Sequence, residues 1–96
     1  MSLFFVQHQH SPETCPAMDP QEGSMLLDHI DSANARKYGL QIFSDAVLDN
    51  QHTFVLIVEA DNPGQIENFM QPFNQIGRVD IWPASTCETV VEREGC

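Results

Sequence analysis

Four stretches of the chain carry the apolar patterning of β-strands. They are Leu3–His10, Leu40–Leu48, His52–Ala60 and Val79–Trp82. The third is the plainest, because its centre, 54–58, is β-branched or bulky and apolar without interruption. Only Asp49-Asn50-Gln51 separates the second stretch from the third, which predicts a hairpin. Simple alternation along the second stretch places Leu40, Ile42, Ala46 and Leu48 on one face.

Two helices are predicted between the strands, and both begin with the same pattern of residue types. The pattern is an Asp or Asn cap, a proline suited to the first turn and a Glu or Gln that can reach back, as in Asp19-Pro20-Gln21-Glu22 and Asn62-Pro63-Gly64-Gln65. The segment between the first strand and the first helix, 11–18, contains two prolines and is expected to be a loop.

The first helix should run to about Ile30, and a further short turn capped by Asp31 or Ser32 should end at Gly39. Apolar spacing places Leu26, Ile30 and Ala33 toward a core. The second helix should bury Ile66, Phe69, Met70 and Phe73, with Pro72 kinking it and Gly77 ending it. Ser85-Thr86-Cys87-Glu88 has the form of a capping box for a short final helix.

The resulting order is β-α-β-β-α-β, which predicts one α+β domain over residues 1–96 with a ferredoxin-like, four-stranded antiparallel sheet. Both helices would cover one face of that sheet. The third strand and the start of the first are apolar on both faces, so the other face would also need cover. Two such sheets packed face to face would provide it, which predicts a homodimer.

Composition narrows the classes of partner. The chain has 14 acidic residues against 4 Lys and Arg, and its formal net charge is -10. Such a charge disfavours nucleic acids and anionic membrane surfaces. The apolar start of the chain has no basic leader, so we expect a cytoplasmic protein with its three cysteines as free thiols.

A cluster of histidines and a cysteine is the main candidate for chemistry. His8 and His10 are two apart on a strand, so both imidazoles project on one face about 7 Å apart. The following loop could bring Cys15 back as a thiolate ligand, and His29 could be a fourth. Imidazoles with a thiolate suit Zn²⁺, Cu or Ni²⁺, and Glu13 in place of the thiolate would suit iron. Alternatively, the two histidines simply bond to backbone and water.

Other candidates carry less weight. Cys87 lies at the start of the final helix, where a thiolate is favoured, but it is expected to be a small buried residue. His52 is interpreted as a surface residue, and Cys96 as exposed. Asp80 could form a His–Asp pair with His8 or His10. The chain lacks a glycine-rich phosphate loop, so no nucleotide cofactor is expected.

One segment resembles a known group. The run reads strand, Glu-Ala-Asp and a helix opened by Pro, in Phe54-Val55-Leu56-Ile57-Val58-Glu59-Ala60-Asp61-Asn62-Pro63. With the chain's size and element order, it is similar to the dimeric α+β barrel superfamily and its small uncharacterised members. That group includes isomerase-like and monooxygenase enzymes, haem-degrading proteins, a non-haem iron oxygenase and small metal-binding proteins. The resemblance implies a fold and selects no reaction.

Two functional hypotheses follow, with a third that involves no chemistry. The first is a transition-metal-binding protein that uses His8, His10 and Cys15, with His29 as a possible fourth ligand. The second is a small cavity enzyme, isomerase-like or monooxygenase-like, that acts on an apolar or aromatic molecule with His8 or His10 as acid or base. The third is a structural or partner-binding dimer.

Overall fold

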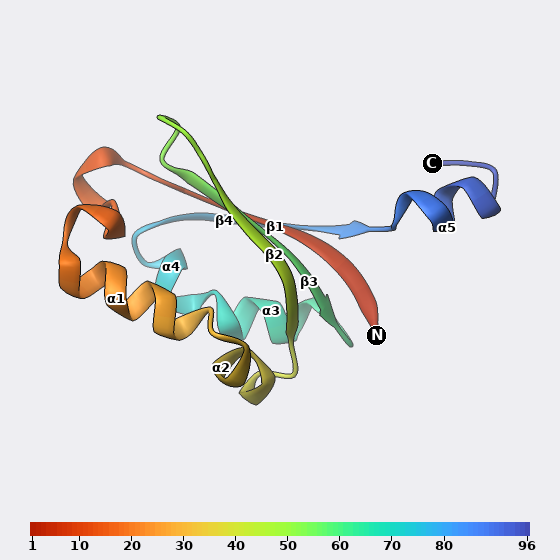
Figure 1. Ribbon diagram of the computed structural model, residues 1–96, viewed down its shortest axis with the longest axis horizontal. Coiled ribbons are helices and arrows are strands. Elements are labelled where there is room, and N and C mark those ends of the chain that lie inside the picture. Colours follow the sequence, from red (N-terminus) through yellow and green to blue (C-terminus); the bar gives the residue numbers. More distant parts are fainter.

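The sheet holds all four expected strands. A computed structural model describes the chain from Met1 to Cys96 (Figure 1). The strands are β1 (Ser2–His10), β2 (Gln41–Leu48), β3 (Thr53–Ala60) and β4 (Gly77–Ala84). They form one antiparallel sheet in the order β2-β3-β1-β4. The α+β class and the ferredoxin-like topology expected from the sequence are thus confirmed.

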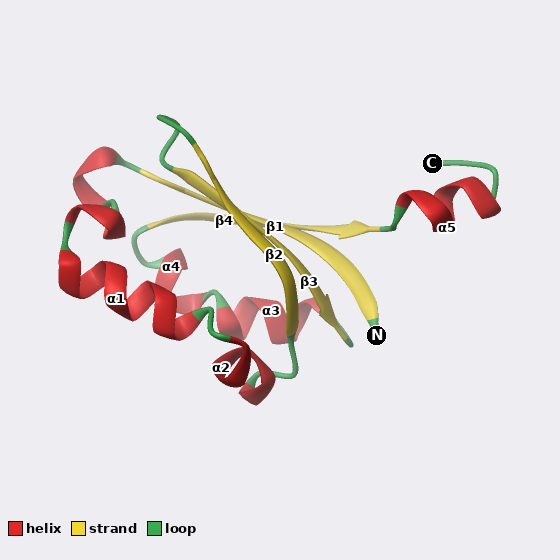
Figure 2. Cartoon of the chain, viewed as in Figure 1, coloured by secondary structure: helices red, strands yellow, loops and turns green.

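Five α-helices complete the fold. They are α1 (Pro20–His29), α2 (Ser32–Lys37), α3 (Pro63–Phe69), α4 (Gln71–Asn74) and α5 (Cys87–Glu92). The first four lie on one face of the sheet, and α5 extends beyond the end of β4 (Figure 2). None of the five has the length and apolar content needed to cross a bilayer.

The two matched helix starts form as the sequence predicts. The Asp19 carboxylate accepts a hydrogen bond from the Gln21 N–H at 2.8 Å, and the Asn62 side chain accepts one from the Gln65 N–H at 3.2 Å. Each bond satisfies an N–H that the first helical turn cannot pair internally. The final helix also forms, but its cap is Thr86, whose side chain accepts from the Thr89 N–H, and not Ser85.

Pro72 divides the second helix into α3 and α4. Proline has no N–H, and the Phe73 N–H bonds to the Met70 carbonyl at 3.0 Å instead of reaching the Phe69 carbonyl. The Phe69 carbonyl is therefore left without the partner that a continuous helix would supply. Gly77, which was expected to end this helix, instead begins β4. β4 continues through Pro83, because a strand at the edge of a sheet tolerates a residue without a backbone N–H.

The core lies between the sheet and helices α1 to α4. It contains twelve buried apolar side chains, including the four expected from the second helix: Ile66, Phe69, Met70 and Phe73. Ala33 was expected in the core and is exposed, whereas Ala35 is fully buried. The reason is that α1 ends at His29 and α2 starts afresh behind the Asp31 cap, which shifts the helical phase.

A β-bulge corrects the expected facing of β2. The pairing of β2 with β3 shifts between Ile42 and Ser44. Ile42 therefore pairs with the buried Val58, whereas Ala46 pairs with Val55 on the other face. One extra residue reverses the alternation beyond it, so the expectation that Ile42, Ala46 and Leu48 share a face is wrong.

The sheet face opposite the helices keeps an apolar surface. Phe43, Ile57 and Trp82 are 51%, 39% and 46% exposed. Phe5 lies between Ile57 and Trp82 in the strand pairing, and the ring centres of Phe5 and Trp82 are 5.8 Å apart. This face carries the apolar surface on which the expectation of a dimer rests.

Gly77 should be essential for the close pairing of β4 with β1. It pairs with His10, and a Cβ at Gly77 would lie 2.3 Å from the Gln9 carbonyl oxygen and 2.8 Å from His8 Nε2. We expect Gly77→Ala to lower the free energy of unfolding by about 1–3 kcal/mol in urea denaturation.

Gly23→Ala in α1 is the matched control. A Cβ there meets only the Pro16 carbonyl oxygen, at 3.6 Å, which is an ordinary contact. Helix propensity should then raise the stability by about 0.5–1 kcal/mol. Equal stabilities for Gly77→Ala and the wild type would contradict the strand contact described here.

Candidate metal centre

Strand register brings His10 and His52 together. The pairing of β1 with β3 ends at Gln9 and Thr53, so His10 and His52 occupy the next opposed positions. The His10 N–H donates to the His52 carbonyl at 3.0 Å, which extends the ladder by one bond. Opposed residues of an antiparallel pair share a face. Their rings meet edge to face, with centres 5.6 Å apart.

The turn between β2 and β3 holds His52 in an uncommon backbone conformation. Asn50 and His52 have φ values of 63° and 48°, in the left-handed region. This region costs a residue with a side chain about 1–2 kcal/mol. The turn is closed by a bond from the Gln51 N–H to the Leu48 carbonyl at 3.1 Å, and the Thr53 hydroxyl donates to the Gln51 carbonyl at 3.0 Å. Such conformations concentrate at functional sites.

The loop after β1 returns Cys15 to the same place. It forms two 3₁₀ turns, Pro12–Thr14 and Pro16–Met18, with Cys15 between them. The Thr14 hydroxyl donates to the Ile76 carbonyl at 3.1 Å, and Pro16 is buried. These contacts anchor the loop on both sides of Cys15.

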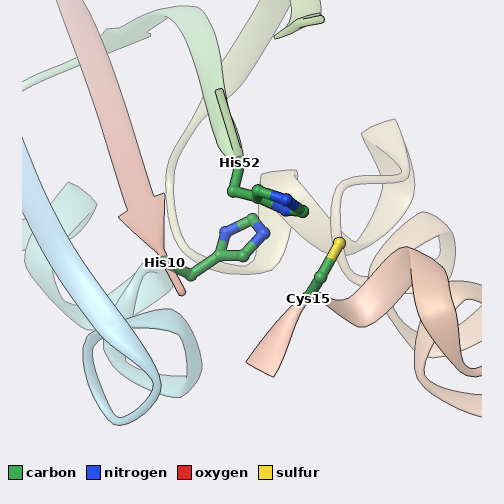
Figure 3. A group of neighbouring side chains, drawn as sticks. All are labelled: His10, Cys15 and His52. Carbon is green, nitrogen blue, oxygen red and sulfur yellow. The ribbon is translucent and has the colours of Figure 1, made fainter. Parts of the chain in front are cut away.

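Three donor side chains therefore converge from three segments of the chain. One ligand atom from each of His10, Cys15 and His52 lies within 4.8 Å of the other two, and all three side chains are half-buried. Figure 3 shows the two rings and the thiol turned toward one another. A tetrahedral zinc ion needs donor separations of about 3.3–3.6 Å, so the atoms must close by at most about 1.5 Å.

A hydrogen bond to His8 orients the ring of His10. His8 is fully buried, and its Nε2 lies 2.8 Å from the Phe73 carbonyl oxygen, which can only accept. Nε2 of His8 therefore carries the proton, and its bare Nδ1 accepts from His10 Nδ1 at 3.4 Å. The Nε2 atom of His10 is then the unprotonated one. It is buried and has no hydrogen-bond partner.

Burial favours the neutral form of both of these histidines. It lowers the pKa of His8 below the usual 6.5, helped by repulsion from His10 and opposed by the bond to Phe73. Burial, followed by repulsion from His52, likewise lowers the pKa of His10. A neutral imidazole is the form that ligates a metal.

His29 lies outside the donor group and has a different partner. Its Nε2 donates to the Phe69 carbonyl at 2.7 Å, and its ring stacks on Phe69 with centres 4.4 Å apart. This is the carbonyl that loses its helical partner, the Phe73 N–H, at the break between α3 and α4. The Asn34 side chain donates to the His29 carbonyl at 2.7 Å, which fixes the end of α1.

Of the four ligands expected from the sequence, the structure brings together His10 and Cys15. His8 contacts His10 but bonds to backbone on its other side, and His29 lies elsewhere. His52, interpreted as a surface residue, is half-buried in the group. The signal for His52 was its place at the start of the third strand, because this topology pairs that start with the end of the first.

The remaining candidates do not join the group. Glu13 is exposed on the first 3₁₀ turn. Asp80 pairs with Arg78, with Nε and Oδ2 3.0 Å apart, on the opposite sheet face from His8 and His10, so the His–Asp pair considered from the sequence does not form. Cys87 is exposed and not buried as expected, and Cys96 is exposed.

A pocket of about 240 Å³ opens beside the donor group. All three donor residues line it, together with an apolar set and two polar residues of the β2–β3 turn. The apolar set is Pro16, Ala17, Leu26, Val47, Leu48 and Phe54, and the polar pair is Asp49 and Asn50.

Comparison with known proteins identifies a family. The family described as Domain of unknown function (DUF3303) matches residues 29–95, well over half of the chain. The chain belongs to this family. No curated protein and no solved structure matches it. Of the three converging donors, the matched DUF3303 segment contains His52, whereas His10 and Cys15 precede it.

The metal-free protein should lose stability as the pH falls below 6.5. The folded-state pKa values of His8 and His10 lie below this unfolded value, so the unfolded chain binds more protons in the window beneath it. The free energy of unfolding therefore decreases with falling pH there and is fully retained above it.

Urea unfolding with a chelator present, from about pH 7.5 down to about pH 5, measures this slope. His8→Leu removes one of the two groups and should flatten the slope, whatever its effect on stability at neutral pH. An unchanged slope in His8→Leu would show that the burial of His8 does not govern the acid response.

Proposed function

We propose that this protein binds a transition-metal ion through His10, Cys15 and His52. The observation that carries the proposal is the convergence of two imidazoles and one thiol from three chain segments, all within 4.8 Å. The buried, unpartnered Nε2 of His10 supports it, because a buried acceptor without a partner costs about 1–3 kcal/mol that a metal bond would offset.

The donor types favour zinc or copper. Thiolates and imidazoles suit Zn²⁺ and Cu, whereas non-haem iron sites use a carboxylate, and the donor group contains none. His8 would act as the outer partner of His10, which holds the ring in position and sets which nitrogen is free. A free thiol is also consistent with a reducing compartment such as the cytoplasm, which we propose as the location.

Metal content should depend on His10 and His52 and should not depend on His29. His10→Ala removes a donor, and His52→Gly removes another while relieving a left-handed backbone. Both should lower zinc affinity by more than 100-fold, because loss of an outer partner alone costs about 10–100-fold. Elemental analysis by mass spectrometry and competition with a chromophoric chelator measure this.

Two variants serve as controls. His29→Ala removes a histidine that bonds to the Phe69 carbonyl, and should retain metal although it destabilises the fold. Asn50→Gly relieves the same kind of backbone as His52→Gly while leaving the donors in place. Equal metal loss in His29→Ala and His10→Ala would refute the assignment of ligands.

A second function is favoured by one observation. The buried Nε2 of His10 belongs to a residue that lines the pocket, where it could act as a general base on a small apolar molecule without any metal. This alternative requires that a ligand bind the chelator-treated protein and that His52→Gly retain the binding. The metal proposal instead requires that His52→Gly lose its affinity for the metal.

We also propose that the domain forms a homodimer of the dimeric α+β barrel type through the open sheet face. The apolar side chains on this face support the proposal, because a solvated sheet face would carry polar residues at these positions.

The oligomeric state should respond to a charge on the open face. We expect the wild type to have twice the 10.8 kDa chain mass in light scattering, and Ile57→Lys to have the chain mass. Leu27→Lys on α1, which is 67% exposed on the helix side, should leave the dimer intact. A monomeric wild type would contradict the proposal.

A further inference from the structure

The pocket beside the donor group offers space for a small molecule next to the proposed metal. We propose that the metal held by His10, Cys15 and His52 keeps one coordination position open and binds there a small uncharged molecule with a nitrogen or sulfur donor and an apolar body. This inference rests on the proposed metal site. Binding would replace a metal-bound water with the donor's lone pair, with no change in the oxidation state of the metal.

The number of donors leaves a position free. Structural zinc sites are closed by four protein ligands, whereas sites that bind a substrate use three and keep the fourth for water or substrate. The group here supplies three: two imidazoles and one thiol. Asp49 is the carboxylate that lines the same pocket, but it is not within the donor group.

The open side faces a preformed space. All three donor residues line the 240 Å³ pocket, so a metal at their centre borders it. Its volume lies below the range of about 300–1,000 Å³ that holds drug-sized ligands, and so suits a single small ring or a short chain. Six of the lining residues are apolar, which matches a ligand with an apolar body.

The charges around the pocket select against anions. Asp49 is the one carboxylate among the lining residues, and no lysine or arginine lines the pocket. The chain as a whole has a formal charge of -10. A divalent ion with one thiolate keeps a single positive charge, which the Asp49 carboxylate can offset, and no positive side chain adds to it. A neutral donor is therefore favoured over an anion of the same size.

Cobalt-loaded protein tests this inference. Co²⁺ substitutes for zinc and reports its ligands through visible bands and a thiolate charge-transfer band. We expect imidazole, a small neutral donor, to shift the visible bands saturably while the thiolate band persists, and azide to act more weakly. Ala17→Trp should fill the pocket from its wall, retain the cobalt spectrum and weaken the imidazole response at least 10-fold.

The control and the outcomes separate the two proposals. Ala33→Trp places the same side chain on α2, away from the pocket, and should respond like the wild type. A cobalt spectrum with a thiolate band that imidazole does not change would overturn the open position and leave the metal site standing. Absence of any thiolate band would overturn both. An undiminished response in Ala17→Trp would overturn the placement in the pocket.

Discussion

The pairing of β1 with β3 is the constraint on which the site depends. It runs from Ser2 opposite Ala60 to Gln9 opposite Thr53, and its continuation places His10 opposite His52. A shift of one residue would turn every β1 side chain to the other face, removing the histidines from the helix side and exposing the core residues Phe4 and Val6. The apolar pattern of the strands therefore selects the register, and the register assembles the donors. The hydrogen bonds that pair these strands thus also bring the two histidines of the site together, and the loop after β1 adds Cys15.

Bonds to backbone carbonyls hold two of the four histidines in place. Pro72 interrupts the helix that follows β3, and the carbonyls of Phe69 and Phe73 accept from the side chains of His29 and His8. These two rings are thereby held as donors to the backbone. His10, oriented by His8, is left with a bare buried nitrogen facing Cys15 and His52. The break at Pro72 thus frees the carbonyl that holds His29, whereas the Phe73 carbonyl that holds His8 also accepts from the Ile76 N–H at the end of α4.

Much of the fold could be predicted because it depends on local signals. The caps at Asp19 and Asn62, the break at Pro72 and the strand patterns each act within a few residues, and together they specify β-α-β-β-α-β. Predictions that needed longer-range information were less successful. The bulge after Ile42 has no sequence marker such as glycine. The spacing of His8 and His10 suggested that they share a metal, because the sequence does not reveal that the Phe73 carbonyl binds His8. His52 becomes a candidate only when the end of β1 is placed against the start of β3.

We propose that His10, Cys15 and His52 bind one metal ion together. X-ray absorption at the zinc edge of the zinc-loaded protein measures the donor set directly. We expect one sulfur at about 2.3 Å and two imidazole nitrogens at about 2.0–2.1 Å, with one further light atom. A shell of nitrogen and oxygen atoms alone, with no sulfur, would contradict it, because Cys15 would then take no part.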